Sequence, residues 1–172
     1  MNKIALEIQD VAKQFNNLLL TDKETIITML YKALADEWLA YYQYWAARHC
    51  TRGEGKVDVD PEFEEHANEE LEHAEKIIVR IKELGGRSFE TVNDFDKFCS
   101  VPNVGAPSQE PRELLKITIK AEEDAINFYK ELEKLTKGVD PTTNRMIKQI
   151  LEDEEKHLYD LNMLLEDIFQ EQ

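Results

Sequence analysis

One helical pattern near the end of the chain sets the strongest limit on what it can fold into. From Met146 to Ile168, apolar residues recur at spacings of three and four, the pattern of an amphipathic helix with one buried face. The same stripe passes through Glu154 and His157. A lone charge on a buried face is unfavourable unless it is neutralised or paired. The fold must therefore provide partners for these two side chains inside its core.

The same Glu-x-x-His spacing occurs on an earlier helical segment, which we expect to begin at Pro61 and to end at Gly85. Its buried stripe passes through Glu70 and His73. The apolar members of this stripe are Phe63, Ala67, Ala74, Ile77, Ile81 and Leu84. The two other histidines, His49 and His66, have no glutamate three residues before them, and we expect both at the surface or at the boundary of the core.

Two further helical segments, expected over residues 22–50 and 111–137, each place one glutamate on an apolar face. These glutamates are Glu37 and Glu122. The two halves of the chain then match at separations of 84 or 85 residues. The matched pairs are Glu37 with Glu122, Tyr44 with Tyr129, Glu70 with Glu154, and His73 with His157. This internal repeat predicts two helical hairpins related by a twofold axis.

The composition and the turn residues predict an all-α protein with one domain over residues 1–172. Glycine (6) and proline (5) are scarce, and a chain of this length can bury a full core. We expect a short helical segment over 1–20, then a four-helix bundle over 22–170 with a long crossover between its second and third helices. Thr21 or Asp22 is the expected cap of the first bundle helix, the stretch VNDFDKFCS is a short helical candidate in the crossover, and the fourth helix should start at Asp140-Pro141.

Two carboxylate-only helices and two Glu-x-x-His helices supply what a dinuclear metal site requires in a bundle core. The predicted ligands are Glu37, Glu70, His73, Glu122, Glu154 and His157. Four carboxylates can neutralise two divalent ions, and a mostly oxygen shell with one imidazole per metal suits iron or manganese, with zinc as a competitor. Without metal, burial and mutual repulsion should raise the pKa values of these carboxyls.

Side chains around the ligands should orient them. Glu69 and Asp153 each precede a glutamate of a Glu-x-x-His pair, and we expect each of them to bond to the histidine of the opposite half. Tyr44 and Tyr129 are expected to bond to the glutamates of the carboxylate-only helices.

The net charge of −15 opposes binding to nucleic acid or to anionic membranes, because both need clustered Lys and Arg. Cys50 and Cys99 form no C-x-x-C pair, which excludes a rubredoxin-type iron centre and a disulfide scaffold. The N-terminus MNKIALEIQD lacks the apolar core of a signal peptide, and no run of about 18 apolar residues occurs. We expect a soluble, cytoplasmic protein.

From about residue 22 to residue 170 the chain resembles the ferritin-like di-iron superfamily. The stretches DEWLAYYQYW and EEHANEELEHAEKI are most similar to Dps-like, bacterioferritin-related proteins, whose members form hollow dodecamers. The resemblance implies iron storage and detoxification, with ferroxidase activity toward Fe(II) using peroxide or dioxygen and two iron ions per chain. It also implies a homo-oligomeric cage, with twelve subunits favoured over 24. Within the site it implies these roles: Glu37 and His73 as terminal ligands of one iron, Glu122 and His157 of the other, and Glu70 and Glu154 as bridges.

At two positions the sequence differs from the family pattern, and these differences argue against haem and against a disulfide relay. Leu71 stands where bacterioferritins carry a haem-binding methionine, so no haem is expected. Cys99 suits the first cysteine of the pair found in many Dps-like relatives, but Asp124 stands in place of the second, which argues against a disulfide relay beside the metals. The alternatives are a rubrerythrin-like peroxidase, a dimanganese catalase without storage, a DNA-packaging protein and a metal-free interaction bundle.

Overall fold

The computed structural model describes the backbone of residues 3–100 and 105–169, with side chains described for residues 22–95, 97–100 and 105–169. Within these ranges the chain is helical and has no strand. The elements are α1 (Lys3–Cys50), α2 (Lys56–Glu83), the 3-10 helix η1 (Val92–Asp94), α3 (Phe95–Phe98), α4 (Pro111–Thr136) and α5 (Pro141–Ile168). No helix among the described residues is both long enough and apolar enough to cross a lipid bilayer.

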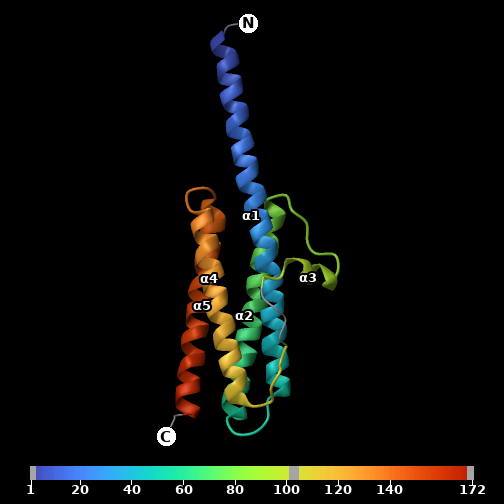
Figure 1. The fold of residues 1–172 in the computed structure, drawn as a ribbon, viewed down its shortest axis with the longest axis vertical. Coiled ribbons are helices and arrows are strands. Elements are labelled where there is room, and N and C mark those ends of the chain that lie inside the picture. Colours follow the sequence, from blue (N-terminus) through green and yellow to red (C-terminus); the bar gives the residue numbers. More distant parts are fainter. Residues whose placement is uncertain (1–2, 101–104, 170–172) are drawn as a thin grey trace.

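The four long helices form the predicted bundle with a crossover (Figure 1). Helix α1 is antiparallel to α2, and α4 is antiparallel to α5, so each half of the chain is a helical hairpin. The connection between α2 and α4 travels the length of the bundle, which makes these two helices parallel. The short helix predicted in this connection is confirmed as η1 and α3, and α3 packs against α1.

The predicted break at Thr21 and Asp22 is wrong, because α1 continues through both residues from Lys3 to Cys50. No glycine or proline occurs over this range. Polar residues such as threonine and aspartate are only weakly unfavourable in a helix interior, so the cap signal alone does not end a helix. The N-terminal part of α1 extends beyond the other helices (Figure 1).

Helix α2 begins at Lys56 and therefore earlier than predicted, with Pro61 inside the helix. The chain turns into the helix at Gly55, which has a φ of 82°. A Cβ atom at this position would lie 2.9 Å from the Cζ atom of Phe169, so both the backbone angle and the close approach require glycine. Because proline has no backbone N–H, Pro61 leaves the carbonyl of Val57 without its helical hydrogen bond. Val57 is 83% exposed, so water can bond to this carbonyl instead.

The predicted start of the last helix is confirmed at Asp140. The Asp140 carboxylate accepts hydrogen bonds from the backbone N–H groups of Thr142 at 3.2 Å and Thr143 at 3.1 Å, as an N-cap does. The same carboxylate pairs with Arg80 at 2.7 Å. This ion pair joins the end of α2 to the start of α5 and so ties the two hairpins together.

Two apolar clusters fill the bundle core, one above the other in the orientation of Figure 1. The upper cluster is made of Ile26, Leu30, Ala33, Leu34, Ala74, Ile77, Ile81, Tyr129, Leu132, Ile147 and Ile150. The lower cluster is made of Tyr44, Ala47, Val59, Phe63, Ala67, Leu114, Leu115 and Leu161. The polar layer between them holds the buried glutamates and histidines.

Candidate metal centre

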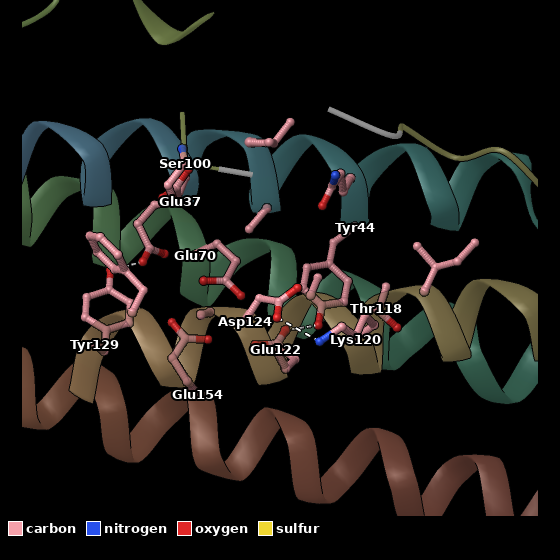
Figure 2. Close-up of a pocket in the computed structure, with 18 of the residues that line it drawn as sticks. Glu37, Tyr44, Glu70, Ser100, Thr118, Lys120, Glu122, Asp124, Tyr129 and Glu154 are labelled. Carbon is pink, nitrogen blue, oxygen red and sulfur yellow. Dashed lines mark hydrogen bonds and ion pairs between the residues drawn. The ribbon is translucent and has the colours of Figure 1, made fainter. Parts of the chain in front are cut away.

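The six residues predicted to bind metal lie together in the polar layer, and none is more than 3% exposed. All four helices of the bundle contribute. Glu37 comes from α1, Glu70 and His73 from α2, Glu122 from α4, and Glu154 and His157 from α5. The four glutamates point into one shared space between the helices (Figure 2).

The six residues form two overlapping groups of four. One group contains Glu37 and His73, the other contains Glu122 and His157, and Glu70 and Glu154 belong to both. Within each group the candidate ligand atoms all lie within 4.8 Å of one another. Because only carboxylates common to both groups can join two metals, this arrangement fits a bridging role for Glu70 and Glu154.

The oxygens of the two shared glutamates divide evenly between the two histidines. Nδ1 of His73 lies 3.2 Å from Oε2 of Glu70 and 3.2 Å from Oε1 of Glu154. Nδ1 of His157 lies 3.3 Å from Oε1 of Glu70 and 3.4 Å from Oε2 of Glu154. Each shared carboxylate therefore presents one oxygen to each half of the site.

Of the two metal-site histidines, each of the remaining two glutamates is close to one, and Glu122 also lies near His66. Nδ1 of His73 lies 3.4 Å from Oε2 of Glu37, and Nδ1 of His157 lies 3.9 Å from Oε1 of Glu122. These positions, one on each side of the shared pair, fit the predicted role of terminal ligands.

The outer ring nitrogen of each histidine is held by the opposite hairpin, as predicted. Nε2 of His73 bonds to Asp153 at 3.1 Å, and Nε2 of His157 bonds to Glu69 at 2.7 Å. A carboxylate on one ring nitrogen fixes the ring orientation and leaves the other nitrogen to face the site. Nδ1 is therefore the nitrogen that faces the other candidate ligands in both histidines.

The two tyrosines hold the terminal glutamates, which confirms their predicted partners. The Tyr44 hydroxyl donates to Oε1 of Glu122, and the Tyr129 hydroxyl donates to Oε1 of Glu37. Both tyrosines are buried. Each of these hydrogen bonds connects α1 with α4, so it also joins the two hairpins.

The pKa values within the cluster differ according to the partners of each group. Burial and then repulsion from Glu154 and Glu70 raise the pKa values of Glu37 and Glu122 well above the usual value. Burial also acts to raise the pKa of Glu70, but the close contacts with the imidazoles of His157 and His73 outweigh it and lower that pKa. The prediction of raised values for all the carboxyls is therefore wrong for Glu70.

The pKa values of His73 and His157 are raised, whereas burial lowers the pKa of most imidazoles. Burial disfavours the imidazolium, but its N–H donates to the carboxylates of Glu154 and other glutamates, and these contacts outweigh burial and raise the pKa of His73 above its usual range. In the same way, burial is outweighed by the nearby carboxylates of Glu154 and Glu70, which raise the pKa of His157 to about 12. Protons thus bring positive charge to the cluster, which divalent metals could replace.

Three buried polar atoms of the cluster have no hydrogen-bond partner in the part of the chain that the structure describes. They are Oε2 of Glu37, Oε1 of Glu70 and Nδ1 of His157. Buried polar atoms in folded proteins nearly always have a partner. Together with the oxygen-rich donor set and one imidazole per group, these atoms fit two divalent ions of the iron or manganese type.

A cavity of about 360 Å³ leads to the cluster between α1 and α4 (Figure 2). Its exposed lining residues are Ser100, Lys116 and Lys120, so one side of the cavity lies at the surface. Asp124, which the sequence resemblance placed where many Dps-like proteins have a second cysteine, also lines the cavity and pairs with Lys120 at 2.8 Å. Cys50 and Cys99 are not joined in a disulfide.

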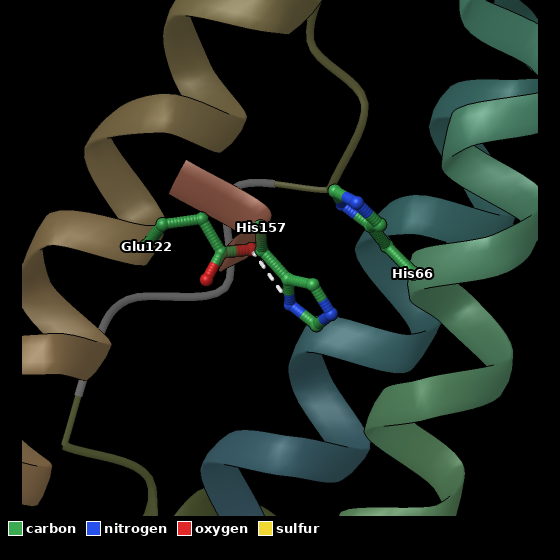
Figure 3. A group of neighbouring side chains, drawn as sticks. All are labelled: His66, Glu122 and His157. Carbon is green, nitrogen blue, oxygen red and sulfur yellow. Dashed lines mark ion pairs between the residues drawn. The ribbon is translucent and has the colours of Figure 1, made fainter. Parts of the chain in front are cut away.

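His66 is a residue of this region that sequence analysis misplaced. It is fully buried, and its ring stacks on His157 with centroids 4.1 Å apart. Its Nδ1 atom lies 3.3 Å from the Tyr44 hydroxyl. Figure 3 shows His66 and His157 with Glu122. Burial and the nearby His157 lower the pKa of His66 to about 3, so its ring is neutral. His49, in contrast, is exposed as expected.

Comparisons with known proteins agree with this architecture. The family model for the ferritin-like domain matches residues 27–170. A DNA protection during starvation protein from Pyrococcus furiosus is 33% identical over 79% of this chain and 74% of its own length. A bacterioferritin from Rhodobacter capsulatus is 29% identical over 77% of this chain and 78% of its own length.

Solved structures include a dodecameric thioferritin, the bacterioferritin-related protein of Bacteroides fragilis. It is 36% identical, with a TM-score of 0.83 over 91% of this chain and 94% of that protein. The bundle with its crossover, the shared glutamates of the core and these relatives lead to one assignment. The chain belongs to the ferritin-like family and lies close to its Dps-like, bacterioferritin-related members.

Proposed function

We propose that this protein stores and detoxifies iron by oxidising Fe(II) at the six-residue cluster and holding the ferric product in a cage of identical subunits. One observation carries the proposal: the cluster consists of two ligand groups that share Glu70 and Glu154. Such sharing is what holds two metal ions close enough to react as a pair.

Each residue of the cluster then has a definite role. Glu37 and His73 would bind one iron, Glu122 and His157 would bind the other, and the shared glutamates would bridge them. Two Fe(II) ions lose one electron each, and peroxide or dioxygen accepts both electrons. Tyr44 and Tyr129 hold the terminal carboxylates in place by hydrogen bonds. The cavity beside α4 gives a small oxidant a route to the cluster.

The source of the electrons distinguishes storage from peroxidase activity. Asp124 lines the cavity, and no cysteine is among its lining residues in the described part of the chain, so a pair of thiols cannot supply electrons there. Reducing equivalents must then come from Fe(II) itself. Iron is in this case the substrate, oxidised in pairs and passed on, and peroxide is consumed only as long as Fe(II) is supplied.

Two features support assembly into a cage, which we propose to be a dodecamer. The bacterioferritin-related protein of B. fragilis is described as a dodecameric thioferritin. In the present chain, Tyr42 and Trp45 stack on the surface of α1 with centroids 6.0 Å apart, and they are 49% and 46% exposed. Exposed aromatic pairs are favoured at protein interfaces. The excess of acidic residues would attract Fe(II) to the particle.

The test combines particle mass, metal content and oxidant use. Purified protein is loaded with Fe(II) without oxygen, and peroxide or dioxygen is then added while its consumption is followed. We expect consumption in proportion to the Fe(II) added, a ferric core visible by electron microscopy, and a particle mass of about twelve chains by light scattering.

The opposite result would favour a rubrerythrin-like peroxidase. It would be sustained removal of peroxide driven by dithiothreitol, with only two irons bound per chain and no mineral. Binding to DNA is the second alternative, because one relative is called a DNA protection protein. The net charge of −15 opposes it, and we expect no shift of DNA in a gel.

A further inference from the structure

A second cluster of metal-binding side chains lies beside the proposed dinuclear centre and is not used by it. Its members are Glu62 and His66 on α2 and Asp160 on α5. The candidate ligand atoms of all three lie within 4.8 Å of one another. His66 also stacks on His157, so the cluster directly adjoins the centre.

The buried imidazole is the feature that points to a ligand. His66 is 0% exposed, and its Nδ1 atom is engaged by the Tyr44 hydroxyl at 3.3 Å. Its other nitrogen, Nε2, faces the two carboxylates and lies 3.1 Å from Oε1 of Glu62. Even so, Nε2 makes no hydrogen bond with suitable geometry to any residue that the structure describes. Buried polar atoms nearly always have a partner, and a cation between Nε2 and the two carboxylates would supply one.

The two carboxylates give this cluster access to solvent. The side chain of Glu62 is 27% exposed and that of Asp160 is 29% exposed. Asp160 also lies 3.7 Å from Nζ of Lys156, a partly exposed contact of the kind that contributes little to stability. The cluster therefore extends from the surface to the wall of the dinuclear centre.

The internal repeat shows that packing alone does not require these residues. At the separation of 84 residues that relates α2 to α5, the counterparts of Glu62, His66 and Asp160 are Met146, Ile150 and Lys76. Ile150 is 0% exposed and fills its place in the upper cluster without a polar atom. An apolar side chain suffices at that position, so His66 calls for another explanation.

We propose that Glu62, His66 and Asp160 form a third cation site, which binds one divalent transition-metal ion through one imidazole nitrogen and two carboxylate oxygens. This donor set suits Fe(II), Mn(II), Co(II) and Zn(II). Three protein ligands leave positions for water, so an ion can be exchanged there. The site is separate from the six residues of the proposed ferroxidase centre, and its existence does not depend on that activity.

Cobalt binding tests the proposal without reference to catalysis. Co(II) bound per chain is measured by equilibrium dialysis for the native protein, Glu62→Gln, Asp160→Asn and the control Glu65→Gln. All three variants lose one negative charge. Glu65 also lies near Lys156, at 3.5 Å, but it is outside the cluster. Anomalous diffraction from crystals grown with Co(II) then locates the ions.

We expect the native protein and Glu65→Gln to bind one more Co(II) per chain than Glu62→Gln or Asp160→Asn. In the crystal, a cobalt peak should lie between His66 and the two carboxylates. Cobalt at the dinuclear centre alone, with equal binding by all four proteins, would overturn the third site while leaving the proposed function intact; His66 would then only position Tyr44. Cobalt at neither place would overturn both, and cobalt at the third site alone would support it and contradict the dinuclear centre.

Discussion

The upper and lower apolar clusters of the bundle are built on the same plan and differ in one buried ionisable side chain. The internal twofold pairs Ile147 with Phe63 and Ile77 with Leu161, and both of these pairs are apolar and fully buried. Two further pairs match an apolar residue with a buried threonine, Ala33 with Thr118 and Val59 with Thr143. Of the aliphatic residues in the two clusters, Ile150 alone has a buried ionisable counterpart, His66. The upper end of the polar layer is closed by an isoleucine, and the lower end is closed by an imidazole.

This difference distinguishes the residues proposed to bind the pair of metals, which occur in both halves of the chain, from residues that occur at one end of the bundle only. The tyrosines, the terminal glutamates, the shared glutamates and the histidines all occur twice, once in each half. His66 and its two carboxylate neighbours occur once. Symmetric residues are therefore the ones assigned to the dinuclear centre, and the residue that breaks the symmetry is the one assigned to exchange with the surface.

The largest effect should come from removing either shared carboxylate. Glu70→Ala and Glu154→Ala each take away a group that belongs to both ligand sets, so we expect each to abolish paired metal binding, and to the same extent because the twofold relates them. Anaerobic titration with Fe(II) measures this. Glu37→Ala and Glu122→Ala are the matched controls and should weaken one metal only. Two tight irons in both of the first variants would show that the bridges are wrongly assigned.

Replacing Ile150 by histidine should lower the free energy of unfolding more than replacing His66 by isoleucine. Ile150→His places a polar ring in the buried apolar cluster at the upper end, and we expect a loss of about 2–4 kcal/mol in the metal-free protein. His66→Ile replaces a poorly bonded ring by an apolar one, and its cost should stay below about 1 kcal/mol. Calorimetric melting of both variants checks the difference, and equal costs would contradict the reading of His66 as a functional residue.

Most of the site could be predicted from the sequence because the ligands interrupt an otherwise apolar stripe. Charged residues such as Glu70 and His73 are unfavourable in a core unless they have partners there. The internal repeat identified those partners in the other half of the chain. The same rule was applied too narrowly to His66. It follows Phe63 by three residues and precedes Glu70 by four, so it lies on the buried stripe even though it has no glutamate three residues earlier.

The helix boundaries were harder to predict because local signals compete with the rest of the chain. Asp140 acted as a cap since a proline and a new helix follow it, whereas Thr21 and Asp22 lie inside a long run without glycine or proline. Pro61 was mistaken for the first helical position. A proline in the second turn leaves a single carbonyl unbonded, which exposure to water offsets, and the sequence gives no sign of that exposure.

The metal-free protein should lose stability as pH rises from about 6.5 to 9. Over this range the unfolded chain has released protons that the folded cluster retains on Glu37, Glu122, His73 and His157, whose folded pKa values are raised. When the folded state holds more protons, the free energy of unfolding falls with increasing pH, by about 1.4 kcal/mol per pH unit for each proton. His66 acts with the opposite sign, because its pKa is lowered to about 3, but only below its usual value of 6.5.

Melting temperatures of the metal-free and metal-loaded proteins, measured as a function of pH, isolate the effect of the cluster, because both forms carry the same surface charges. Metal replaces the protons and stabilises the folded state by mass action, so the loaded protein should show a much flatter profile over the same range. A metal-free protein whose melting temperature rises with pH above 6.5 would contradict the buried cluster of glutamates and imidazoliums.

The smallest effect we expect is a difference between the two tyrosines that hold the terminal glutamates. Tyr129→Phe removes one hydrogen bond, to Glu37, and should cost about 1 kcal/mol of unfolding free energy. Tyr44→Phe removes the bond to Glu122 and also the contact with Nδ1 of His66, so we expect roughly 1 kcal/mol more. Tyr159→Phe serves as the control, because Tyr159 is 63% exposed.

A double mutant shows whether that excess arises through the imidazole. In the His66→Ile background Tyr44 has only Glu122 left to bond, as Tyr129 has only Glu37. Tyr44→Phe should then cost the same as Tyr129→Phe, and the two ends of the polar layer should become equivalent. If the excess persists without His66, the asymmetry between the two clusters lies in the surrounding packing, and the imidazole is not its source.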